Sequence, residues 1–337
     1  MHRTFRLVFR TAIVAVLFGL PAYAEEPIVL KFSHVTAADS PKGKAALRFK
    51  AVAEKRTNGR VKVEVYADGS LYTEKDEVDG LLTGKVQMLA PPFSRLEALG
   101  IKEFALFSVP YLFAGDDVLH RIQNGRIGQD VLKKLESKEI VGLGYWDNGF
   151  KSMSANRPLH RPEDFRGLKM RIATPTHEPL MRALGATPIQ MPYADVYQAL
   201  KTGKVDGSDN VPANLYTSKM HEVQKHITVS NHVYLGYVLI TNKKFWNGLP
   251  PNIRAQLKIA AADATHFADL YAEQENDEAL AKIKASGKSE VYELSAEERG
   301  LWHKALLPVR KEFEPKVGKG LLDEVGKESD ALGYKKK

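Results

Sequence analysis

The sequence predicts an α/β fold of two lobes, in which mostly parallel sheets are flanked by helices and one long helix spans both lobes. Strand and helix patterns alternate along nearly the whole chain, as expected of βαβ units. The chain has 337 residues, more than one hydrophobic core usually serves, so we expect two lobes. Residues 252–286 contain neither Gly nor Pro, and a helix of that length extends on the order of 50 Å.

In the first half, residue spacing marks the strands and helices, and Gly and Pro mark their ends. Val61, Val63 and Val65 alternate with polar residues, which is the pattern of a half-buried strand. Pro41 follows Ser40, a capping signal at the start of a helix. We therefore predict strands at 28–35, 61–65, 86–90 and 140–146, and helices at 41–57, 74–84 and 116–136.

The second half repeats this alternation. Residues 206–210, D-G-S-D-N, have the composition of a loop. Tyr193 falls on an amphipathic helix, where core packing is its expected role. The run 252–286 has apolar residues on one helical face, although two helices with an unmarked break would also fit this pattern. We predict strands at 168–173, 187–191, near 205 and at 233–242, and helices at 177–185, 193–203, 212–224 and 252–286.

The first 24 residues have the pattern of a secretory signal peptide. Three arginines and a histidine precede a ten-residue apolar run at 11–20, which is too short for a stable membrane anchor. A-Y-A at 22–24 is a small-x-small cleavage signal. We expect cleavage after Ala24 and export from the cytoplasm; the alternative is an uncleaved anchor.

Composition excludes several kinds of chemistry. The chain has no cysteine, which excludes disulfides, thiolate nucleophiles and zinc–thiolate sites. No phosphate loop, nucleophile elbow or H-E-x-x-H motif occurs, and we predict no catalytic residue, metal or other cofactor. The net charge of +8 is dispersed, and the run 335–337 has the pattern of a solvated tail, so we expect no nucleic-acid partner.

The most informative stretch is P-E-D-F-R-G-L-K-M-R-I-A at 162–173, because it places an arginine inside a buried strand. The apolar residues Leu168, Met170 and Ile172 alternate with Lys169, Arg171 and Ala173, as in a strand. A guanidinium stays charged, so a buried one needs an anion. Either the protein supplies that anion through an internal salt bridge, or a ligand does.

Further polar residues stand at or just beyond the carboxyl ends of predicted strands, where ligands of open α/β sheets bind. They come from both halves of the chain, so we expect them to meet in a cleft between the lobes. Lys42 lies in the first turn of a helix, where the helix dipole favours anions. The candidate residues are His34, Lys42, Asn148, Lys151, Arg171, Asn210 and Asn214.

At these residues the chain resembles the substrate-binding subunits of TRAP (tripartite ATP-independent periplasmic) transporters, and most closely the branch that binds four-carbon dicarboxylates. The resemblance implies that Arg171 pairs with a ligand carboxylate, that Asn210 and Lys151 bind the ligand, and that His34 and Lys42 line the site. It rests on H-V-T-A-A-D-S-P-K-G-K-A-A, W-D-N-G-F-K-S-M-S-A-N-R-P-L, P-E-D-F-R-G-L-K-M-R-I and V-D-G-S-D-N-x-x-x-N-L-Y, which occur in this order.

The resemblance implies a periplasmic-binding-protein-like fold that closes around succinate, fumarate or malate and delivers it to a sodium-driven membrane permease. Arg171 would clamp one carboxylate, and Lys151, Lys42 or His34 would meet the other. We place lobe I at 25–148 plus 237–277 and lobe II at 149–236 plus 278–337, and we expect a monomer. The alternatives are a monocarboxylate, sugar acid or aromatic acid as the ligand, a periplasmic hydrolase or isomerase, and a protein that presents ligand to a sensor kinase.

Overall fold

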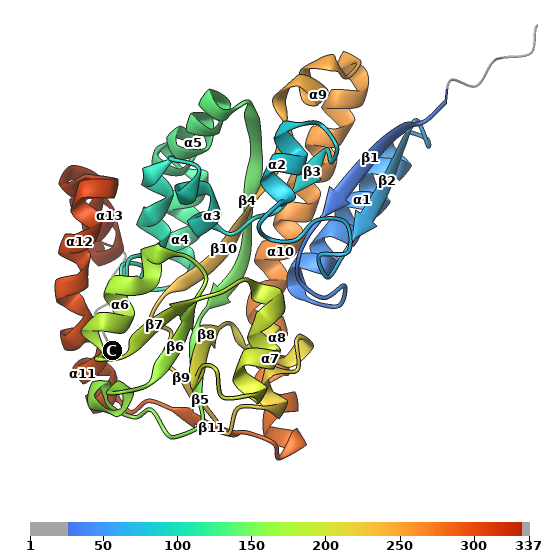
Figure 1. Ribbon diagram of the computed structural model, residues 1–337. Coiled ribbons are helices and arrows are strands. Elements are labelled where there is room, and N and C mark those ends of the chain that lie inside the picture. The colour runs from blue at the N-terminus through green and yellow to red at the C-terminus, as the bar shows by residue number, and fades with distance from the viewer. Residues whose placement is uncertain (1–25, 332–337) are drawn as a thin grey trace, which may run out of the picture.

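Two β-sheets with helices packed around them form the computed structural model, which describes residues 26–331 (Figure 1). The predicted cleavage point at Ala24 and the lysines at 335–337 lie outside the described residues. In spatial order, the first sheet contains β2 (Val61–Tyr66), β1 (Ile28–Ser33), β3 (Met88–Leu89), β10 (Tyr234–Asn242) and β4 (Ile140–Phe150). The second contains β11 (Glu290–Glu293), β9 (His226–Val229), β5 (Ser152–Ala155), β8 (Gly207–Asn210), β6 (Lys169–Ile172) and β7 (Thr187–Gln190).

Among the described residues, the second sheet is mostly parallel, with three parallel and two antiparallel strand pairs, and the first has two of each. Every one of these antiparallel pairs involves β5 or β10. These two strands follow the places where the chain crosses between the sheets. Helices flank the sheets, as the sequence predicts. Their bounds are α1 (Pro41–Arg56), α2 (Glu77–Leu82), α3 (Phe93–Ala98), α4 (Asp116–Asn124), α5 (Arg126–Lys133), α6 (Glu178–Ala183), α7 (Val196–Lys201), α8 (Pro212–Thr217), α9 (Lys243–Gly248), α10 (Pro251–Ser286), α11 (Ala296–Leu306), α12 (Arg310–Val317) and α13 (Lys319–Ala331).

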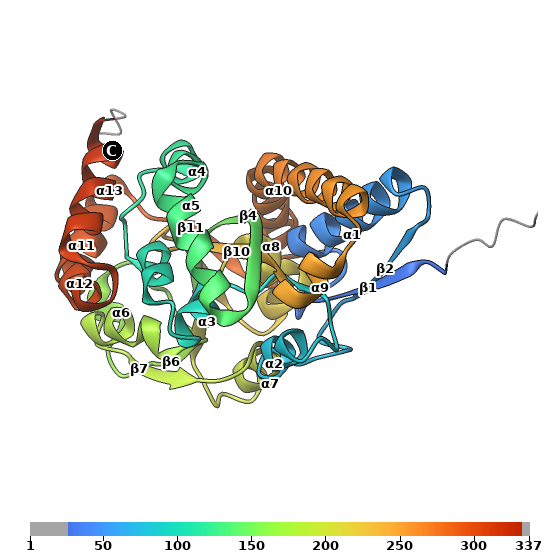
Figure 2. The same cartoon turned by 90° about the horizontal axis from the view of Figure 1, so that it is seen from above.

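The long helix α10 is continuous over 36 residues, which excludes the alternative of two helices. It contacts α1 beside the first sheet and α8 beside the second. Figure 2 shows α10 beside α1, with α11–α13 on the opposite side of the molecule. At about 1.5 Å per residue α10 extends roughly 54 Å, so one rigid element connects both halves of the fold.

Besides α10 itself, two segments of the chain cross between the sheets, and α10 is hydrogen-bonded to the first of them. Lys151 separates β4 of the first sheet from β5 of the second, and β9 of the second sheet precedes β10 of the first. Asn276 of α10 donates to the carbonyl oxygen of Asn148 at 2.9 Å and accepts from the backbone of Ala213 at 3.0 Å. Gly149 has a φ of +97°, and a Cβ there would lie 2.5 Å from the Asn276 amide, so only glycine fits this crossing.

Three sequence-based assignments were wrong in detail. The helix predicted at 116–136 is divided into α4 and α5, because Gly125 adopts an extended conformation between them. Residues 207–210 form β8 rather than a loop, because this segment is buried between β5 and β6. Gly207 allows that close approach, since a Cβ would lie 2.3 Å from the carbonyl oxygen of Ser154. The 193–203 segment is a short 3-10 turn followed by α7.

The C-terminal helices pack beside both halves of the fold. α11 contacts α6, whereas α12 contacts the 3-10 helix Lys102–Ser108. Within residues 26–331, no helix is long and apolar enough to cross a membrane. The same part of the chain contains no cluster of three or more His, Asp or Glu side chains arranged to hold a metal ion.

Candidate ligand-binding site

A cavity of about 60 Å³ is lined by residues from both sheets, close to the carboxyl ends of β6 and β8. A single water needs roughly 10–15 Å³, so the cavity accommodates a small molecule of several atoms. The predicted residues His34 and Asn148 are buried but do not belong to its lining. The other five predicted residues do line it: Lys42, Lys151, Arg171, Asn210 and Asn214.

Arg171 lies in β6 and is only 5% exposed. Its Nε and Nη2 atoms donate to the carbonyl oxygen of Met191, at 3.2 and 3.0 Å. Within the described part of the chain, no carboxylate forms a salt bridge with Arg171, and Glu74 and Asp209 act on it only at longer range. Burial lowers the pKa of Arg171, yet a guanidinium stays protonated at neutral pH. Three of its five N–H donors therefore remain for a ligand.

Lys151 also lines the cavity, but its charge is neutralised by the protein. Its Nζ lies 3.1 Å from Oδ2 of Asp209 on β8. The Nε2 atom of His232 lies 3.4 Å from the same oxygen, and the other ring nitrogen contacts Ser230 at 2.8 Å. Burial opposes ionisation of Asp209, but Lys151 and His232 hold the pKa of this carboxyl well below its usual range. Lys151 is therefore part of an internal ion pair.

Two amide side chains donate to the hydroxyl of Tyr237, and one of them also bonds to a third amide. Asn214 donates to Oδ1 of Asn210 at 3.0 Å and to the Tyr237 hydroxyl at 3.3 Å. Asn148 donates to the same hydroxyl at 3.0 Å. Because the hydroxyl accepts from both amides, its own proton is available to a ligand. The Oδ1 atoms of Asn148 and Asn214 are buried without a hydrogen-bond partner in the structure.

Lys42 is the remaining predicted cation of the cavity. The Ser40 side chain caps α1 and positions Lys42 in the first turn. The Lys42 Nζ donates to the carbonyl oxygen of Ala90 at 3.2 Å and lies 4.0 Å from the centre of the Tyr237 ring. Burial, together with the nearby Lys42 charge, lowers the pKa of His34 to about 3. His34 is therefore neutral, and Lys42 is the better group to meet a second carboxylate.

No pattern in the sequence indicates Glu74, which connects elements beside the two sheets. Its carboxylate accepts from the backbone N–H of Tyr193 at 2.9 Å and from Nε of Arg95 at 3.2 Å. Burial opposes its ionisation, but Arg95 holds the pKa of Glu74 below its usual value. The expected role of Tyr193 in core packing was incomplete, because Tyr193 lines the cavity and its hydroxyl lies 2.6 Å from Ser218. The spacing of apolar residues along a helix indicates which face is buried, but it does not show that Tyr193 on that face borders a cavity.

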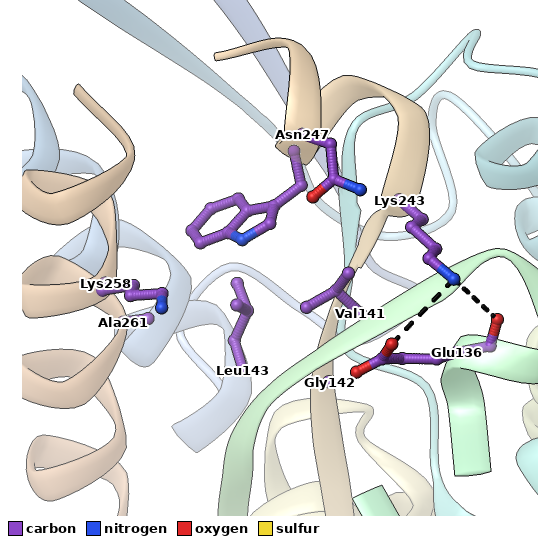
Figure 3. A pocket seen from close by; sticks show the side chains of 9 residues that line it. Glu136, Val141, Gly142, Leu143, Lys243, Asn247, Lys258 and Ala261 are labelled. Atoms are coloured by element: carbon purple, nitrogen blue, oxygen red, sulfur yellow. Dashed lines mark hydrogen bonds and ion pairs between the residues drawn. The ribbon is translucent and has the colours of Figure 1, made fainter. Parts of the chain in front are cut away.

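A larger cavity, of about 440 Å³, lies elsewhere, between β4, α9 and α10 (Figure 3). Val141, Leu143 and Trp246 are the large apolar residues of its lining. Lys243 is directed to Glu136, donating to its carbonyl oxygen at 3.3 Å. None of the predicted site residues lines this cavity, and Lys243 is already paired there with Glu136. We therefore assign the ligand site to the smaller cavity, where buried donors of several elements face one another.

Two α/β units joined by crossing strands, with buried donors around a small cavity between them, define a solute-binding protein. The family model of the bacterial extracellular solute-binding proteins, family 7, matches residues 32–316. The chain belongs to this family, and an extracellular family agrees with the predicted export. The TRAP resemblance and the two-lobed fold predicted from the sequence are confirmed.

Individual relatives agree over nearly the whole chain. The C4-dicarboxylate-binding periplasmic protein DctP of Rhodobacter capsulatus is 51% identical over 313 residues, which is 93% of each protein. A TRAP periplasmic solute-binding protein of Shewanella oneidensis with bound succinate has a TM-score of 0.87 and 37% identity, covering 90% of this chain and 99% of that one. A TRAP protein of Pseudomonas aeruginosa with bound L-malate has a TM-score of 0.83 and 41% identity, covering 85% of this chain and 100% of that one.

Proposed function

We propose that this protein binds a C4-dicarboxylate such as succinate, fumarate or malate in the periplasm and delivers it to the membrane permease of a TRAP transporter. The observation that carries the proposal is Arg171. It is a buried guanidinium with three free N–H donors facing a cavity, and no described carboxylate forms a salt bridge with it. The ligands named for the relatives above support a small organic dianion.

In the proposed complex the two ligand carboxylates meet different cations. Arg171 holds one of them with two parallel hydrogen bonds, because its planar fork matches carboxylate geometry. Lys42 meets the other, since Lys151 is already neutralised by Asp209. Asn210, Asn214 and the Tyr237 hydroxyl add neutral hydrogen bonds, with Asn148 orienting Tyr237 from behind.

The proposed role is binding without catalysis or a cofactor, carried out by a monomer. We retain the predicted lobes, 25–148 plus 237–277 and 149–236 plus 278–337. Movement of the two lobes away from each other would separate Glu74 from Tyr193 and expose the cavity. Closure of the lobes around the ligand would restore that contact.

Calorimetry with succinate and butyrate tests this function, because the two acids differ by one carboxylate. We expect succinate to bind at least about 30-fold more tightly, since butyrate leaves the buried Lys42 without a carboxylate at salt-bridge distance, at a cost of roughly 2 kcal/mol or more. Equal affinities would instead indicate a monocarboxylate-binding protein. Conversion of malate to a new species in NMR spectra would indicate an enzyme.

A further inference from the structure

Close to Lys42 lies a third buried carboxylate, that of Glu77. Glu77 is the first residue of α2 and is 2% exposed, and its Oε1 atom is buried without a hydrogen-bond partner. Lys42 and Glu77 attract each other through space, but no salt bridge joins them in the structure. Holding an ionised carboxylate in such a place is costly, because the group is removed from bulk solvent and no described cation lies within salt-bridge distance to compensate its burial.

The charges around the cavity do not match a dianion while Glu77 is ionised. Four cations and three carboxylates line the cavity or lie directly behind it: Lys42, Arg95, Lys151 and Arg171, with Glu74, Glu77 and Asp209. Their net charge is therefore one positive unit, and a bound dianion would leave the closed site with one negative unit. Protonation of one carboxylate would make the closed site neutral.

Glu77 is the carboxylate best suited to accept that proton. Asp209 has Lys151 within hydrogen-bond distance, and Glu74 has Arg95. Glu77 has no lysine or arginine of residues 26–331 within hydrogen-bond distance. A ligand carboxylate at Lys42 would also compete with Glu77 for that cation. We propose that Glu77 takes up a proton when a dicarboxylate binds, so that capture of the dianion is coupled to proton uptake. This inference rests on the proposed function.

The electrostatics of the free site agree with this assignment. Burial raises the pKa of Glu77 to about 7, with Glu74 adding to the increase and Lys42 and Arg95 opposing it. Burial likewise lowers the pKa of Lys42 to about 8. A ligand carboxylate beside Lys42 would raise both pKa values, so Glu77 would gain a proton near neutral pH. Binding that takes up a proton weakens as pH rises, here by about fourfold between pH 6.0 and 7.5.

Two measurements test the coupling: calorimetry of succinate binding at pH 7.5 in buffers with different ionisation enthalpies, and infrared difference spectra of the same reaction. We expect uptake of more than half a proton and the appearance of a protonated-carboxyl band in the unmodified protein. Glu77→Gln should abolish the band, bind succinate at least as tightly at pH 7.5, and reduce the uptake by more than half. Asp79→Asn is the matched control, because Asp79 is exposed in the same helical turn and should change nothing.

A result that contradicts the proton coupling can be distinguished from one that contradicts the proposed function. Binding heat that does not depend on the buffer would refute the coupling and leave the proposed function intact. Uptake without a carboxyl band would assign the proton to a nitrogen base, such as Lys42 or the buried His177, and would also refute it. A band that persists in Glu77→Gln would assign the proton to another buried carboxyl, such as Glu74 or Asp209, with the same consequence. Absence of binding heat with succinate, fumarate and malate would refute the proposed function and this inference together.

Discussion

Replacing Arg171 by alanine should weaken dicarboxylate binding by about 30-fold or more. Two of the five N–H donors of Arg171 are engaged by Met191, so the ligand carboxylate is expected to use the remaining edge of the guanidinium. Removing one partner of a buried charge pair costs roughly 2–5 kcal/mol, which corresponds to about 30- to 4,000-fold in affinity. Arg171→Lys should also bind poorly, because an ammonium group cannot make two parallel hydrogen bonds.

Titration calorimetry with succinate measures this loss, and thermal unfolding without ligand separates it from a loss of stability. Arg171→Ala leaves the Met191 carbonyl without its partner, which costs about 1–3 kcal/mol of folding free energy if that group stays buried. Arg182→Ala is the control, because Arg182 is exposed on α6 and forms a surface pair with Glu178. Affinity unchanged in both Arg171 variants, with the fold intact, would refute the assignment of Arg171 to the ligand.

Three further predictions concern closure and stability. Glu74→Ala should speed succinate dissociation about tenfold with little change in the association rate, because a buried contact to the Tyr193 backbone costs about 1–3 kcal/mol when it is lost; equal stopped-flow dissociation rates would exclude this role. Burial raises the pKa of Asp269 to about 6, so the stability that its protonated form contributes is lost as pH rises through that value. Asp269→Asn should therefore have a larger free energy of unfolding than the unmodified protein at pH 8, by about 1–3 kcal/mol in urea titrations, and no such advantage at pH 4. Saturating succinate should decrease the radius of gyration in X-ray scattering, and an unchanged curve would contradict a site that closes between lobes.

Local patterns in the sequence were sufficient for most elements. The alternation of valines in β2, the capping signals of α1 and the Gly- and Pro-free run of α10 each depend on neighbouring residues, so the sequence alone indicates them. The short strands β5, β9 and β11 were missed because their pairing partners are distant in the chain. Isolated four-residue segments carry too little periodicity to indicate a strand.

The candidate site, too, could be predicted from the sequence only in part. Strand-end position and the resemblance to TRAP proteins selected Arg171, Lys42 and Asn210, and the structure places these residues around one cavity. The sequence could not show that Lys151 is neutralised by Asp209, because a salt bridge depends on the distance between two strands that only the folded sheet brings together.

The sequence by itself thus determined the class of fold, the long helix and the presence of a buried arginine, because each follows from periodicity or from the chemistry of one side chain. Only the tertiary structure decided which charges are free and which are compensated. It placed Met191 rather than a carboxylate beside Arg171, and it buried Glu77 near Lys42, with no salt bridge between the two. Electrostatic energy depends on distance and burial, and both arise when segments far apart in the chain pack against each other.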